Sequence, residues 1–184
     1  MKKTTIGIIA IVLIIGFFTV GKYNNLVKLD NEVDTAFAQV QVVVKRRADL
    51  IPNLVETVKG YANFEQETLT KITEARAGVN NATTPEELAN ANEQVTESIR
   101  NFNVAVEAYP ELKANANFLD LQAQLEGTEN RIATERQRYN ETVQIYNASV
   151  RSFPMNIFAK MLGFEQKPFF EAAADEQNAP DIKF

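Results

Sequence analysis

Apolar residues recur at alternating spacings of three and four along most of the chain. This period matches one face of an α-helix, whereas a half-buried strand would alternate every second residue. The first stripe comprises Leu26, Leu29, Val33, Ala36, Val40, Val43, Arg47, Leu50, Leu54, Val58 and Tyr61. It predicts a long helix over residues 23–60, with a kink near Ala48–Pro52 because proline removes one backbone hydrogen bond and crowds the preceding turn.

Three further helices follow the same rule. Residues 64–79 form the second, and Thr84-Pro85-Glu86-Glu87 marks the start of the third, because this string can form a capping box with proline in the first turn. The third helix ends near Pro110, and the fourth runs from about residue 117 to residue 152. Its stripe comprises Phe118, Leu121, Leu125, Thr128, Ile132, Glu135, Tyr139, Val143, Tyr146, Val150 and Phe153.

These helices predict an all-α fold, an antiparallel up-and-down four-helix bundle over residues 22–153. The first and fourth helices would be about 57 Å and about 54 Å long. Short connections favour antiparallel neighbours, so residues 23 and 152 would lie at the same end of the bundle. The spacing of three and four is also that of coiled-coil packing.

An uncharged run, Ile6–Val20, precedes the bundle and predicts a transmembrane anchor over residues 1–21. Extending the run through Thr4 and Gly21 gives 18 residues, within the range of about 17–25 for a spanning helix. The prediction is a single-pass protein of the cell membrane. A cleaved signal peptide is the alternative, although the run lacks an A-x-A-like cleavage site. Basic residues are balanced on the two sides of the run, so the sequence leaves the orientation open.

The composition excludes several kinds of chemistry. The 184 residues include no His, no Cys and no Trp. The chain itself therefore supplies no disulfide, thiol nucleophile, imidazole metal ligand or Ser-His-Asp triad. The net charge of −5 and the single short basic run, Lys45-Arg46-Arg47, argue against a nucleic-acid partner. No cofactor is expected, because no nucleotide-binding loop is present.

Two other patterns have both a structural and a functional interpretation. Carboxylates are frequent on the last helix, but di-metal bundles combine glutamate with a Glu-x-x-His motif, which this chain lacks. A solvated charged face is the simpler interpretation. Tyr139-Asn140 and Tyr146-Asn147 lie one heptad apart. Tyrosines on a helical seam are commonly core residues, and partner binding is the alternative.

Arg47 is the only charged residue on the first stripe. An unpaired buried guanidinium would be costly, so we expect a structural ion pair with the last helix. If residue 23 lies beside residue 152, Arg47 lies opposite about residue 129. Glu129 is therefore the first candidate partner, followed by Glu126 and Glu135. The alternative is that Arg47 extends its charged group to solvent.

Residues 154–164 predict a short amphipathic helix after the bundle. Its only charge is Lys160, and its apolar residues suit a helix that lies in the membrane interface beside the anchor. We assign Lys22, Tyr23, Phe158 and Lys160 to that interface. The alternative is that these apolar residues cap the open end of the bundle as ordinary core. Residues 165–184 predict a flexible acidic tail.

Several strings of this sequence resemble the LemA family. They are Tyr23–Leu29, Arg46–Ala62, Glu74–Arg76, Tyr109–Phe118, Leu121–Ile132, Arg138–Asn147 and Phe153–Phe164. The resemblance covers residues 22 to about 170. It implies a bacterial single-pass membrane protein with a four-helix bundle domain, the N-terminus outside and the bundle inside, and it names no substrate. Phe64 departs from the family, in which histidine is more typical there, and this weakens any inferred metal site.

The sequence therefore predicts a non-enzymatic, membrane-tethered module that binds another protein or organises the envelope. The expected partners are membrane lipid, through the N-terminal helix, and a protein of unknown identity. No catalytic, cofactor-binding or metal residue is assigned. A metal-dependent or hydrolytic enzyme using bundle carboxylates is the alternative, and a lipid-binding bundle is a weaker one. The lack of a recognisable nucleophile–base constellation favours the first interpretation.

Overall fold

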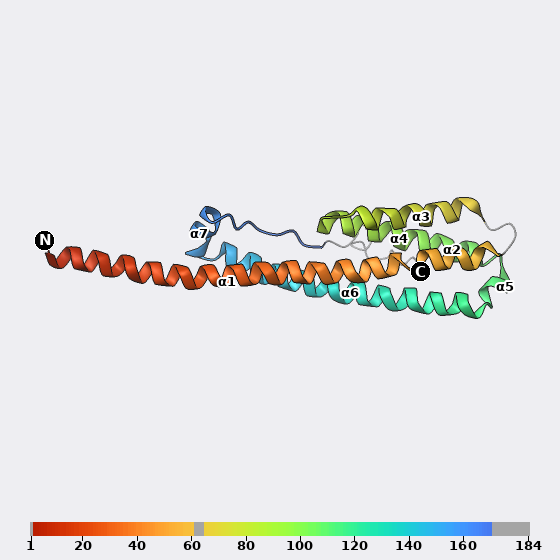
Figure 1. The fold of residues 1–184 in the computed structure, drawn as a ribbon, viewed down its shortest axis with the longest axis horizontal. Coiled ribbons are helices and arrows are strands. Elements are labelled where there is room, and N and C mark those ends of the chain that lie inside the picture. Colours follow the sequence, from red (N-terminus) through yellow and green to blue (C-terminus); the bar gives the residue numbers. More distant parts are fainter. Residues whose placement is uncertain (1, 61–64, 171–184) are drawn as a thin grey trace, which may run out of the picture.

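The chain is described by a computed structural model over residues 2–60 and 65–170, with side chains from Val20 onward. Every described element is a helix, which confirms the all-α prediction (Figure 1). In chain order the helices are α1 (Lys2–Ala48), α2 (Ile51–Lys59), α3 (Gln66–Asn81), α4 (Pro85–Val106), α5 (Pro110–Lys113), α6 (Ala116–Arg151) and α7 (Met155–Met161).

Local sequence signals account for the helix ends. The capping box forms at the start of α4, where the Thr84 hydroxyl accepts from the Glu87 backbone N–H and the Glu87 carboxylate accepts from the Thr84 N–H. The Asn115 side chain caps α6 by accepting from the Phe118 N–H. The first predicted helix is interrupted at residues 49–50, and Pro52 lies in the first turn of α2, where its missing N–H is tolerated.

The helices form an elongated rod. α1 and α6 run antiparallel side by side and make the most extensive helix pairing, and α3 and α4 form the second such pair (Figure 1). α2 packs on α3 and α6, and α1 also meets α3 and α4. The N-terminal part of α1 continues beyond α7, outside the rest of the rod, whereas α5 lies at the opposite end (Figure 1).

The buried seam follows the predicted stripes with two differences. At two positions of the first stripe the buried residue is one place further on, so that Val44 and Ile51 are buried where Val43 and Leu50 were expected, while Arg47, Leu54 and Val58 are buried as expected. A helix has 3.6 residues per turn, so a neighbour of a stripe spaced at an average of 3.5 can lie nearer the centre of the buried face. At the end of the last stripe, Phe153 is 82% exposed, because α6 ends before it.

The predicted anchor falls mostly outside the described side chains. The backbone of residues 2–19 is helical and continuous with the rest of α1, but their side chains are not among those described. Within the described part of the chain, no helix combines the length and the apolar character needed to cross a bilayer.

The predicted tail at residues 165–184 needs a correction at its start. Residues 165–170 are extended and run from α7 back along the rod (Figure 1). They are held by hydrogen bonds from α6, and Phe170 is buried in the core with 2% of its surface exposed. The prediction was wrong for these six residues because an extended segment that pairs with side chains has no periodic apolar pattern. Residues 171–184 lie outside the described residues.

Candidate functional site

The most distinctive polar site in the interior is centred on Arg47, near the C-terminal end of α1. Only 4% of its surface is exposed. Its guanidinium forms an ion pair with the Glu129 carboxylate on α6. The same nitrogen, Nη1, donates to the Thr96 hydroxyl at 2.8 Å and to Asn92 Oδ1 at 3.4 Å, both on α4. One side chain thus joins three helices.

The electrostatics of this site combine a burial cost with a compensating charge. Burial lowers the pKa of Arg47, and the charge and hydrogen bond of Glu129 act in the opposite direction. Glu129 itself is half-exposed, with 41% of its side-chain surface accessible. The guanidinium is therefore shielded from water, whereas the carboxylate can still be hydrated. Loss of the ion pair would leave the Arg47 charge uncompensated, but water could compensate the Glu129 charge.

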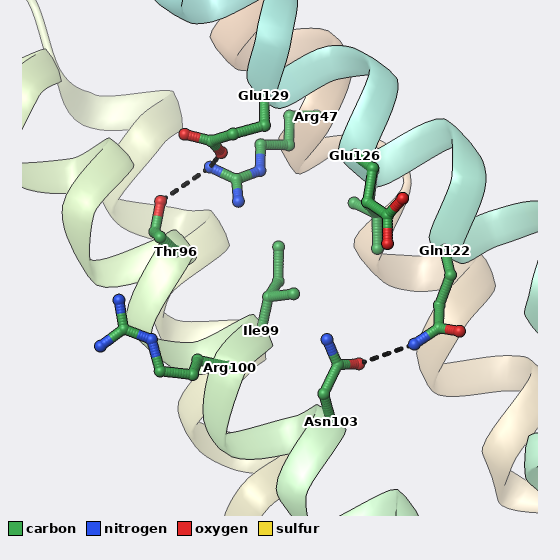
Figure 2. Close-up of a pocket in the computed structure, with 9 residues that line it drawn as sticks. Arg47, Thr96, Ile99, Arg100, Asn103, Gln122, Glu126 and Glu129 are labelled. Atoms are coloured by element: carbon green, nitrogen blue, oxygen red, sulfur yellow. Dashed lines mark hydrogen bonds and ion pairs between the residues drawn. The ribbon is translucent and has the colours of Figure 1, made fainter.

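A pocket of about 300 Å³ opens beside this ion pair (Figure 2). Residues of α1, α4 and α6 line it, and Gln122 Nε2 donates to Asn103 Oδ1 across it at 3.3 Å. Figure 2 shows Arg47, Glu129 and Thr96 meeting at one end, with Asn103 and Gln122 at the other. The Thr96 hydroxyl accepts from Arg47 and donates to the Asn92 carbonyl at 3.0 Å, so this hydroxyl is already engaged. These polar contacts connect α1, α4 and α6 to one another.

The structure brings the two members of the expected ion pair, Arg47 and Glu129, together. The other two candidate partners lie elsewhere: Glu126 lines the pocket without an ion pair to Arg47, and Glu135 faces Arg138 on its own helix at 3.9 Å. Sequence reasoning missed the two contacts of Arg47 on α4, Thr96 and Asn92. Asn92 could have been predicted to have a polar partner. It lies on the apolar stripe of α4 and is buried, and a buried amide needs a hydrogen-bond partner.

The carboxylates of the enzyme alternative do not gather into a metal-binding cluster in the described part of the chain. Within residues 2–60 and 65–170, no group of three or more Asp, Glu, His or Cys side chains is placed to hold a metal ion. Glu126, Glu129 and Glu135 project instead at successive positions along α6.

The residues assigned to a membrane interface lie at one end of the rod. The Tyr23 ring meets the Phe164 ring edge-on, with centroids 5.8 Å apart, so α1 at Tyr23 is in contact with the segment after α7. Lys22 and Lys160 are exposed. Phe158 is half-buried against the core and points inward rather than outward. The exposed apolar side chains at this end are Val20, Phe153, Ile157, Met161 and Leu162.

Comparisons with known proteins show which family this chain resembles over most of its length. The model of the LemA family matches residues 36–184. Protein LemA of Metamycoplasma hominis is 30% identical over 177 residues, covering 92% of this chain and 80% of that protein.

More distant similarity extends to magnetosome proteins. Magnetosome protein MamQ 2 of Paramagnetospirillum magneticum is 22% identical, covering 82% of this chain and 65% of that protein. Magnetosome protein MamQ of Magnetospirillum gryphiswaldense is 20% identical, covering 88% and 70%. The family match spans most of the chain and confirms the resemblance seen in the sequence. The chain belongs to the LemA family.

Proposed function

We propose that this protein is a non-enzymatic interaction module, a four-helix bundle held at the cell membrane by a single N-terminal span. In this account residues 1–21 form the anchor and α1 continues from the bilayer into the bundle. The α7 end rests on the membrane surface, and the rest of the rod projects from it to meet a protein partner.

The observation that carries this proposal is where the exposed apolar side chains gather. Phe153 and Met161 are 82% and 80% exposed, and Ile157 and Leu162 lie near them, all within one short stretch around α7. This stretch lies at the end of the rod from which the N-terminal part of α1 projects (Figure 1). An exposed apolar patch beside an apolar helix, with Lys22 and Lys160 placed to reach headgroups, suits a membrane interface.

The Arg47 site supports the non-enzymatic part of the proposal. Its guanidinium and the Thr96 hydroxyl are used to join α1, α4 and α6, and this hydroxyl donates its proton to the Asn92 carbonyl rather than to a carboxylate. Catalysis by a hydroxyl needs a nucleophile hydrogen-bonded to a base that a third group orients. The polar groups beside the pocket therefore suit a structural role, in which they connect the helices.

The anchor is tested by the mass of the membrane-bound protein. We expect the chain to stay with the membrane after alkaline washing and to keep its full mass of 20.6 kDa, because an uncleaved span is retained in the bilayer. Mass spectrometry of the extracted protein gives the answer. A control lacking residues 1–21 should be released by the wash. Release of the full chain, or a product shortened by about 20 residues as signal cleavage leaves it, would contradict the anchor.

A further inference from the structure

Two asparagines on α6 form hydrogen bonds with the backbone of the extended segment, residues 165–170. Asn147 donates from Nδ2 to the Lys167 carbonyl at 2.9 Å and accepts at Oδ1 from the Lys167 N–H at 2.8 Å. Asn140 makes the same pair of bonds with Phe170, at 2.9 Å and 2.8 Å. Each side-chain amide therefore bonds both the N–H and the C=O of a single residue, as a residue of a neighbouring antiparallel strand would. We call residues 165–170 the strap.

The spacing of these contacts follows from helix and strand geometry. Asn140 and Asn147 are seven residues apart, which is about 10.5 Å along a helix. Lys167 and Phe170 are three residues apart, which is about 10 Å in an extended chain. A heptad of asparagines on a helix therefore matches every third residue of an extended peptide. The hydrogen bonds involve only the main chain of the strap and do not depend on its side chains.

Side chains of the strap add recognition at two positions. The Lys167 ammonium lies 2.9 Å from an Asp30 carboxylate oxygen and 2.7 Å from one of Asp34, both on α1. Burial acts to lower the pKa of Lys167, but hydrogen bonds and charge from the two aspartates outweigh it, and the pKa is raised. Three residues on, the Phe170 ring is buried, with the Arg136 guanidinium 5.1 Å from its centroid.

Pro168, which follows Lys167, is compatible with this mode of binding. Pro168 has no N–H to satisfy, and its carbonyl accepts from the Tyr139 hydroxyl at 2.9 Å. The two Tyr-Asn pairs of the sequence thus divide their roles: the tyrosines are buried, as core residues would be, while their asparagine neighbours and the Tyr139 hydroxyl contact the strap.

We infer that the face of α1 and α6 that contacts the strap is a recognition site for an extended peptide segment with a lysine three residues before a buried aromatic residue, and that the strap occupies it as a displaceable ligand. The partner that fits is a protein carrying this pattern in an extended stretch. Main-chain bonds supply affinity and the lysine and aromatic positions supply specificity, as in other modes that bind extended peptides. This inference rests on the interaction role proposed above and names its ligand class, but it does not depend on membrane docking.

The test uses the full chain in detergent and a fluorescent peptide with the sequence Phe-Glu-Gln-Lys-Pro-Phe-Phe, that of residues 164–170. The strap is weakened by Lys167→Ala with Phe170→Ala, which removes its charge and its buried ring. We expect the peptide to bind this variant at least about tenfold more tightly than it binds the unaltered chain, whose strap competes at high effective concentration. Adding Asn140→Ala and Asn147→Ala should weaken binding at least about tenfold. Fluorescence anisotropy measures both, and circular dichroism checks that the helices remain.

A charge exchange keeps the test decisive if the asparagine variants do not fold. A peptide with glutamate in place of its lysine should bind the strap-weakened protein at least about tenfold more weakly, and Asp30→Lys with Asp34→Lys should restore its binding. Equal affinity for both peptides would overturn the proposed specificity. Absence of peptide binding to the strap-weakened chain, or equal binding to the unaltered chain, would overturn the recognition site itself. Neither result would bear on the membrane anchor.

Discussion

Glu129→Ala is expected to lower the free energy of unfolding by about 3 kcal/mol, because it leaves the buried Arg47 guanidinium without its carboxylate partner. Thr96 and Asn92 would still accept from Arg47, but neutral acceptors do not replace a charge. Replacing Arg47 should lower the free energy of unfolding by less. After Arg47→Met the half-exposed Glu129 can be hydrated, and the expected loss is about 1 kcal/mol, near the value of one hydrogen bond.

Urea unfolding of the full chain in detergent, followed by helical circular dichroism, measures these losses. Glu126→Ala is a matched control, since Glu126 lines the same pocket on the same helix but forms no ion pair within the described residues. Its loss should stay within about 0.5 kcal/mol. A double-mutant cycle on Arg47→Ala and Glu129→Ala should give a coupling of about 1–3 kcal/mol. Additive losses would show that the pair is not coupled.

Phe118→Ala is expected to lower the free energy of unfolding by about 3–5 kcal/mol through loss of buried area and creation of a cavity. Phe118 is fully buried at the start of α6, and its ring lies 6.2 Å from that of Phe102 on α4. This contact connects the two helix pairs at the end of the rod far from α7. The same unfolding measurement applies.

The neighbouring residue provides the comparison for this change. Leu119 is on the same helical turn but is exposed, and Leu119→Ala should cost less than about 1 kcal/mol. Similar losses for Phe118→Ala and Leu119→Ala would mean that α6 does not bury the face described here, and the packing of α4 against α6 would have to be revised.

Much of the fold could be predicted because it depends on local rules. The start of α4 follows from a four-residue capping signal, and the last long helix was predicted over residues 117–152 and lies at 116–151. Two long antiparallel helices also have a calculable register, since each residue advances about 1.5 Å along either axis. This is why Glu129 could be named as the first candidate partner of Arg47 from the sequence.

Two features could not be predicted from the sequence. One is the side from which a third helix packs on the α1–α6 pair, and the other is the course of the non-helical segments. Register along α1 and α6 does not fix which side α4 approaches from, so Thr96 and Asn92 could not be named as contacts of Arg47. The strap has no periodic pattern, and its partners are polar side chains of α6. Phe158 was assigned to the membrane interface from the apolar composition of residues 154–164 and their place beside the anchor, whereas in the structure its side chain packs against the core.

We propose that the α7 end of the bundle rests on the bilayer while the rest of the rod stands in water. Because the chain has no cysteine, single nitroxide labels can be introduced without background. Three exposed positions sample the rod: Ile157 on α7, Val42 along α1 and Val104 near the far end.

The decisive measurement is nitroxide accessibility for the full chain in lipid nanodiscs, using oxygen, which concentrates in the bilayer, and a water-soluble nickel chelate. We expect the label at Ile157 to collide mainly with oxygen and to be shielded from nickel, whereas labels at Val42 and Val104 should collide freely with nickel. Equal, water-like nickel accessibility at all three positions would contradict the claim that this end of the bundle rests on the membrane.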